Sequence, residues 1–126
     1  MRTSTPLVVV NRYLDAIAGR DFEMARSCLA DTGFRYLSPI AEFADPDAFV
    51  ASMEGVGAIL HDIKTVHSFV DGDTVCHVLD VRVSMSGYQT RRVVQLAKVR
   101  EGHIVDLEVL FDASEYRRMF GAAQQD

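Results

Sequence analysis

The chain has 126 residues, and its 48% hydrophobic and 25% charged residues indicate one globular domain spanning 1–126. A net charge of −5 argues against nucleic acid or an anionic membrane surface as a partner. The sequence has neither the roughly 18-residue apolar run that crosses a bilayer nor a signal-peptide pattern, so we expect a cytoplasmic protein.

The first half of the chain carries helical patterns. Thr5 before Pro6 and Asp45 before Pro46 both predict helix starts, because Thr and Asp are good N-caps and Pro suits the first helical position. The predicted elements of this half are a helix from Pro6 to Gly19, a helix over 22–29, a short strand over 34–37, a loop over 41–44 and a helix over 46–59.

From residue 61 the pattern changes to an alternation of apolar and polar residues, which is typical of strands. Asp71-Gly72 predicts a two-residue hairpin turn of type I′, and Arg100 to Gly102 predicts a three-residue turn. The predicted strands cover 63–70, 75–85, 90–100 and 104–111, followed by a short helix through Phe120. Helices followed by an antiparallel meander predict an α+β fold with three helices on the concave face of a curved antiparallel sheet.

The strand over 75–85 has one unusual feature, which is that Asp80 and Arg82 share a face. If that face is solvated, the two residues form a surface pair of little consequence. If it faces the concavity, they are the chemical centre of the protein.

The sequence offers little for a metal or cofactor. Cys28 and Cys76 lie far apart in unlike contexts, so we expect two free thiols. No set of His, Cys or acidic residues has metal-ligand spacing, and Gly55 and Gly57 fall late in a helix rather than in a phosphate-binding loop. We therefore expect no cofactor and no metal.

Three segments, Val9–Tyr13, Asp21–Asp31 and Gly102–Phe111, resemble the nuclear transport factor 2-like superfamily, which includes SnoaL-like cyclases and ketosteroid isomerases. The resemblance implies a cone-shaped, cystatin-like sheet with a small-molecule pocket on its concave side. It also implies that Tyr13 donates a hydrogen bond to a ligand carbonyl. Ser38 stands where ketosteroid isomerases have their Asp base, and Gln95 stands near their second oxyanion donor.

The predicted turns pair His67 with Cys76 and Asp80 with Gln95 across neighbouring strands, and partners of this kind share a face. The resemblance places this face inside the cone. The residues then expected to contact a ligand are Phe34, Tyr36, Ser38, Phe49, Met53, Cys76, Val78, Arg82, Gln95, Leu107 and Val109. Simple binary patterning favours the reverse, in which Leu79 and Val81 pack on the helices and Asp80 is solvated.

Two functions remain open at this level. The first is a cofactor-free acid–base isomerase, cyclase or dehydratase acting on a small hydrophobic carbonyl compound, with Asp80 and His67 transferring protons and Tyr13 polarising the substrate. The alternative is a non-catalytic ligand-binding or dimerisation module of the same fold. The opposite sheet face is rich in Val and Leu, so we expect a homodimer through it.

Overall fold

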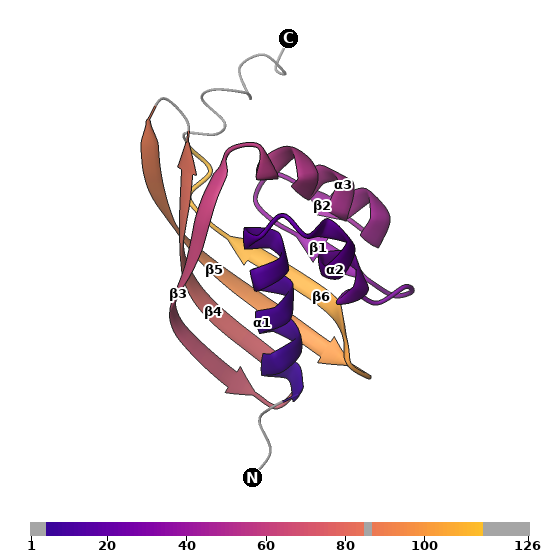
Figure 1. The fold of residues 1–126 in the computed structure, drawn as a ribbon. Helices are drawn as coiled ribbons and strands as arrows, with labels where there is room; N and C mark the ends of the chain where they lie inside the picture. Colours follow the sequence, from indigo (N-terminus) through magenta and orange to yellow (C-terminus); the bar gives the residue numbers. More distant parts are fainter. Residues whose placement is uncertain (1–4, 85–86, 115–126) are drawn as a thin grey trace.

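The computed structural model describes residues 5–84 and 87–114. Its elements are α1 (Thr5–Ala18), α2 (Phe22–Ser27), β1 (Arg35–Leu37), β2 (Glu42–Phe43), α3 (Pro46–Gly57), β3 (Leu60–Asp71), β4 (Thr74–Ser84), β5 (Tyr88–Arg100) and β6 (His103–Leu110) (Figure 1). The predicted order of three helices before a long meander is confirmed. Met85, and the terminal helix expected to run through Phe120, lie outside the described residues, apart from the first positions of that helix.

The strands form one six-stranded sheet in the order β2-β1-β6-β5-β4-β3. Strands β3 to β6 make the predicted antiparallel meander, whereas β1 runs parallel to β6, so the sheet is mixed. Residues 42–43, expected in a loop, form the edge strand β2. The sheet is curved, and α1 lies across its concave face (Figure 1). No helix of the described ranges is long and apolar enough to span a bilayer.

The predicted helix starts of α2 and α3 are confirmed by their side-chain caps. The Asp21 carboxylate accepts a hydrogen bond from the Met24 N–H, and the Asp45 carboxylate accepts one from the Asp47 N–H. Each bond satisfies a backbone donor that has no partner within its own helix.

The end of α3 is tied to the first helices and to β3. The Arg20 guanidinium donates hydrogen bonds to the carbonyls of Gly57 and Leu60. Gly57 also packs closely on Phe22, because a Cβ atom at Gly57 would lie 2.9 Å from the Phe22 Cζ. These contacts set the position of the helices above the sheet.

Both predicted hairpin turns differ from the structure by one residue. Asp71 pairs with Thr74, so the first turn begins at Gly72, whose φ is 61°. The second turn has two residues rather than three, Glu101 and Gly102, with φ values of 53° and 80°. Positive φ at both central residues is the property of a type I′ turn. Such shifts matter because a change of one residue in register turns a strand's side chains to the other face.

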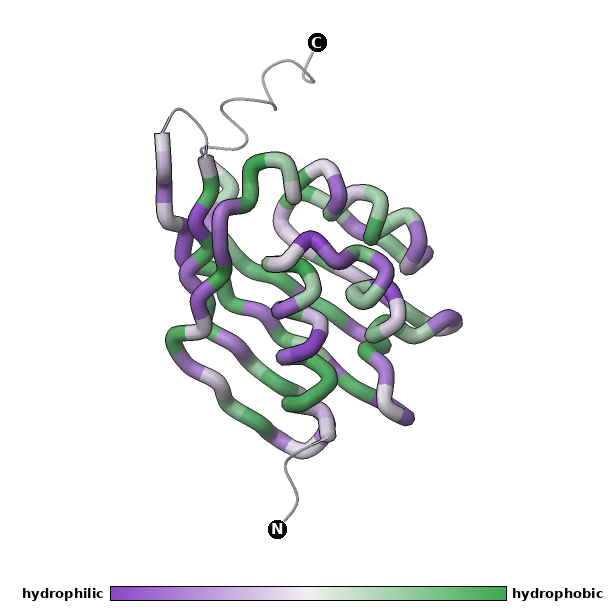
Figure 2. The backbone as a smooth tube through the Cα atoms, viewed as in Figure 1, coloured by the Kyte–Doolittle hydropathy of each residue, from purple (hydrophilic) through white to green (hydrophobic). Residues whose placement is uncertain are grey.

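The core lies between α1 and the concave face of the sheet, and apolar and polar residues alternate along the strands beneath it (Figure 2). Val10 and Ile17 of α1 are almost fully buried, as are Val75, Ala97 and Leu107 on neighbouring strands. An aromatic cluster closes the β1 side of this core. Its members are Phe34, Tyr36, Phe43 and Phe49, and the Tyr36 and Phe49 rings stack with centroids 4.3 Å apart.

Candidate functional site

The orientation of β4 decides which side chains enter the concavity. Val75, His77 and Leu79 are buried beneath the helices, and the residues between them face outward. Asp80 pairs with Arg92 on β5, three positions away from the expected partner Gln95. An odd shift reverses the face, so the expected inward position of Asp80 is wrong.

The expected inward positions of four other residues are wrong for the same reason. Cys76, Val78 and Arg82 share the outer face of β4 with Asp80, and exposed His67 pairs with Val78 on β3. For β4 the structure shows the binary-pattern alternative. For β5 it does not, because Val94 and Leu96, which the same patterning would also pack on the helices, pair with Val78 and Cys76 on the outer face.

The chemistry of Asp80 explains this choice of face. Its Oδ1 lies 2.7 Å from the Arg92 Nε in an exposed ion pair, and this hydrogen bond holds the pKa of Asp80 below its ordinary value. A charged carboxylate loses hydration when buried, whereas Val75 and Leu79 gain stability from burial. The orientation of β4 with Asp80 outward and Val75 and Leu79 inward therefore has the lower free energy.

The other expected ligand contacts do lie on the inner side. Leu107 and Gln95 are buried on the concave face, while Val109 and Met53 are half-buried beside the core. Phe34, Tyr36 and Phe49 belong to the aromatic cluster, and Ser38 is buried at the β1–β2 turn. Their position in the interior is as predicted, and their role in ligand binding stays a prediction.

A buried polar pair lies at the centre of the concave face. His77 on β4 and Gln95 on β5 are directly opposite each other and are 0% and 4% exposed. His77 Nε2 lies 2.9 Å from the side-chain oxygen of Asn11 on α1. His77 Nδ1 and Gln95 Nε2 are buried without a hydrogen-bond partner among the described residues. Burial lowers the pKa of His77, so its imidazole is neutral at neutral pH.

Sequence reasoning placed His77 on the outer face and so missed it. The signal was present, because His77 stands within the apolar alternate set of β4, between Val75 and Leu79. A polar residue in an apolar series marks a buried polar position.

The concave face is covered unevenly. Val75, Ala97 and Leu107 are fully buried at one end of the inner face. Towards the other end Leu79, Val83 and Leu60 are also buried, whereas Ile63, Val81 and Val93 are only half-buried. The polar pair lies between these two regions, since Gln95 is flanked along β5 by Ala97 and Val93 on its own face.

Tyr13 is the remaining predicted donor. It is buried on α1, and this burial, with Tyr36 and Cys28 nearby, raises the pKa of its hydroxyl well above its ordinary value. The hydroxyl therefore stays protonated and can donate a hydrogen bond.

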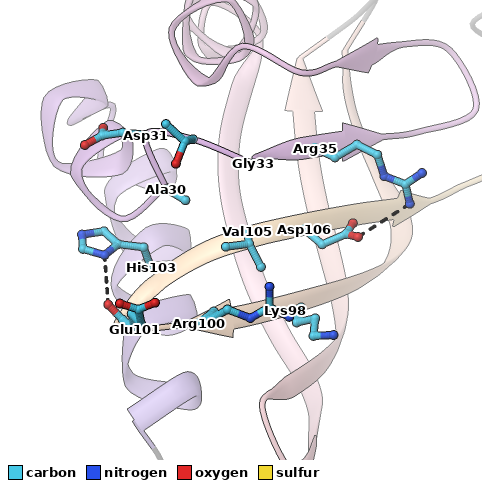
Figure 3. A pocket seen from close by; sticks show the side chains of 11 residues that line it. Ala30, Asp31, Gly33, Arg35, Lys98, Arg100, Glu101, His103, Val105 and Asp106 are labelled. Carbon is cyan, nitrogen blue, oxygen red and sulfur yellow. Dashed lines mark hydrogen bonds and ion pairs between the residues drawn. The ribbon is translucent and has the colours of Figure 1, made fainter.

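A separate hollow of about 580 Å³ lies beside the loop before β1 and strands β5 and β6 (Figure 3). Its charged side chains are of both signs: Arg35 Nη2 lies 3.7 Å from Asp106 Oδ2, and Lys98 and Glu101 also line it. None of the buried polar side chains within residues 5–84 and 87–114 lies there. Among the described residues, no group of three His, Cys, Asp or Glu could hold a metal ion.

Comparison with known proteins bears on this arrangement. The SnoaL-like domain family matches residues 10–107. Curated protein sequences give no match. Similar solved structures include a nuclear transport factor 2-like protein of unknown function from Cytophaga hutchinsonii, with 23% identity, coverage of 92% of this chain and 98% of that chain, and a TM-score of 0.76.

Two others show the same fold. An LEH-like epoxide hydrolase of M. tuberculosis has 17% identity, coverage of 97% and 92%, and a TM-score of 0.77. A protein with a ketosteroid isomerase-like fold from Catenulispora acidiphila, in complex with trimethylamine, has 14% identity, coverage of 90% and 92%, and a TM-score of 0.75. The family model covers most of the chain, so the chain, which has the fold of nuclear transport factor 2-like proteins, belongs to the SnoaL-like domain family.

Proposed function

We propose that the protein binds a small, mainly apolar molecule on the concave face of its sheet. The observation that carries this proposal is the half-buried apolar surface of Val81, Val93 and Val109 leading to the buried polar pair His77 and Gln95. Small-molecule sites combine a largely apolar lining with a few polar groups in this way.

The interior favours recognition by neutral hydrogen bonds. No Asp or Glu of the described ranges is buried, and the buried polar side chains are Ser38, His77 and Gln95. The hydroxyl of Tyr13 adds a further neutral donor. A cationic ligand would enter this interior without a buried carboxylate of the described residues to offset its lost hydration. An uncharged molecule is therefore a better match than a cation.

The test is an NMR titration of the full chain with uncharged probes such as 4-ethylphenol and cyclohexanone. We expect the methyl signals of Val81, Val93 and Val109 to shift on binding. Val93→Phe, which fills the concave surface, should weaken binding, whereas Val94→Phe on the outer face of the same strand should not. Equal effects of the two variants, or no methyl shifts, would contradict the proposal.

Acid–base catalysis is the second candidate, now centred on His77 instead of Asp80 and His67. Asn11 Oδ1 can only accept, so His77 Nε2 carries the proton and Nδ1 presents a lone pair that can take one up. Tyr13 stays protonated and can polarise a carbonyl. Isomerisation, cyclisation, dehydration or hydration of a carbonyl compound would each use such a base and donor.

Hydrogen–deuterium exchange separates catalysis from binding. If His77 removes a proton next to a carbonyl, the protein should accelerate exchange of cyclohexanone α-protons in D₂O, and His77→Gln should abolish the acceleration. A probe that binds without faster exchange would leave the binding function alone.

A second copy of the chain is the proposed partner, through the outer sheet face. The rows across this face place Phe69, Val78, Leu96 and Leu110 together, with Glu108 opposite Leu96 at the β6 side, and Phe69 and Leu110 are 59% and 47% exposed. Charged rows flank this apolar band, namely Lys64, Asp80 and Arg92 at one end and Arg35, Asp106 and Lys98 at the other. An apolar centre with a charged rim is typical of protein interfaces.

Sedimentation velocity would test this partner. We expect a dimer for the unmodified chain and a monomer for Leu96→Lys, which places a charge in the apolar band. A monomer in both cases would refute it. The cytoplasmic location stays a prediction.

A further inference from the structure

We propose that His77 and Gln95 together bind a hydroxyl group of the ligand. The hydroxyl donates its proton to His77 Nδ1 and accepts a hydrogen bond from Gln95 Nε2. This inference rests on the proposed binding of a small molecule to the concave face, and it names the chemical class of that molecule as an alcohol, phenol or enol with an apolar body.

The roles of the two nitrogen atoms follow from Asn11. Its side-chain oxygen lies 2.9 Å from His77 Nε2, and an amide oxygen can only accept a hydrogen bond. His77 Nε2 therefore donates, and in a neutral imidazole the other nitrogen, Nδ1, is then an acceptor. Gln95 Nε2 is a donor. The buried pair thus offers one acceptor and one donor side by side on neighbouring strands.

Both atoms need a partner that the described residues do not supply. Nearly all buried polar atoms in native proteins are hydrogen-bonded, so two orphaned atoms on adjacent strands indicate a missing group. A carbonyl oxygen accepts from Gln95 but cannot donate to His77, and a carboxylate has the same limitation and adds an unpaired charge. A hydroxyl group satisfies both atoms at once.

The surroundings of the pair define the rest of the ligand. Along β5, Gln95 is flanked on the inner face by Ala97 and Val93, and His77 is flanked along β4 by Val75 and Leu79. Along the two strands these neighbours are apolar, and across β3 the exposed Ser68 pairs with His77. The hydroxyl would therefore stand at the inner end of the ligand, with its apolar part along Val93 and the half-buried residues beyond it.

The experiment compares 4-ethylphenol with 4-ethylanisole, which has the same apolar body but a methyl ether in place of the hydroxyl. NMR titrations of the full chain would give both affinities from the methyl signals of Val81 and Val93. We expect the phenol to bind about tenfold more tightly, the usual effect of one neutral hydrogen bond together with an orphaned partner. We also expect phenol binding to shift the His77 ¹⁵Nδ1 and Gln95 side-chain amide signals.

Two variants test whether the preference for the phenol arises at the buried polar pair. His77→Leu removes the acceptor that only the phenol hydroxyl can use, so the preference should fall to about threefold or less. Leu79→Met, a volume-conserving change on the same inner face, should keep the tenfold preference. A preference that is lost equally in both variants would reflect repacking of the core and would overturn the inference.

The outcomes also separate this inference from the proposed function. Equal affinities of the two probes, with shifted methyl signals, would overturn the hydroxyl subsite and leave ligand binding intact. An absence of methyl shifts with either probe would refute both. If His77 ¹⁵Nδ1 already has the shift of a hydrogen-bonded nitrogen in the free protein and the phenol does not change it, a buried water occupies the pair and the inference is wrong.

Discussion

Acid should destabilise this protein through His77. The side chain is fully buried, and burial lowers its pKa below the ordinary value of 6.5. The unfolded chain therefore binds this proton more readily than the folded chain does. The stability that the neutral, buried His77 contributes is therefore complete above about pH 6.5 and is lost as the pH falls below this value. One site changes stability by at most about 1.36 kcal/mol per pH unit, so the loss at pH 5 reaches at most about 2 kcal/mol.

Urea unfolding between about pH 7.5 and pH 5 measures this loss. His77→Gln keeps a donor for Asn11 but does not titrate, so the stability difference between the unmodified chain and the variant should narrow by up to about 2 kcal/mol on acidification. His67→Gln, on the exposed outer face, is the matched control for a His-to-Gln substitution outside the core. Parallel pH profiles for the unmodified chain and His77→Gln would refute the reasoning.

Three further predictions follow from packing, backbone conformation and sheet orientation. Phe49→Ala should cost about 3–5 kcal/mol in urea unfolding, because the buried ring stacks on Tyr36, and a loss under about 1 kcal/mol would contradict this packing. Glu101→Asn should stabilise the protein by about 0.5–1 kcal/mol, measured as a raised Tm, because Asn tolerates the left-handed conformation better, and an unchanged Tm would count against this explanation. Asp80→Asn should leave probe binding unchanged in the NMR titration, and a loss as large as that of Val93→Phe would place the site on the outer face.

The fold could be predicted because its signals are local. Asp21 and Asp45 precede their helices as capping residues, and both caps form in the structure. The change from helical spacing to alternation near residue 61 likewise marks the start of the meander. Strand β2 was missed because two residues carry no periodic pattern, and its pairing with β1 is a tertiary contact.

The site was harder to predict because strand faces depend on register, and register depends on turns that differ by single residues. Ser84 pairs with Tyr88, and the same register pairs Asp80 with Arg92 rather than Gln95. The faces of β5 and β6 were nevertheless predicted as observed. Gln95 pairs with Val109 instead of the expected Leu107, and this two-residue shift in register keeps Gln95 and Leu107 on the inner side. For β4, the free energy gained by burying Val75 and Leu79 would have predicted the inner face correctly.

The same energetics favour binding over catalysis in this interior. If His77 accepted a proton, a positive charge would form where no carboxylate of the described residues is buried to stabilise it. Ser38 offers no substitute, because its hydroxyl is a poor base and already accepts a hydrogen bond from the Ile40 N–H in the β1–β2 turn. Hydrogen bonding to a hydroxyl requires no charge at either His77 or Gln95. Binding therefore uses the interior as it stands, whereas proton transfer would need a ligand that supplies the missing negative charge as it reacts.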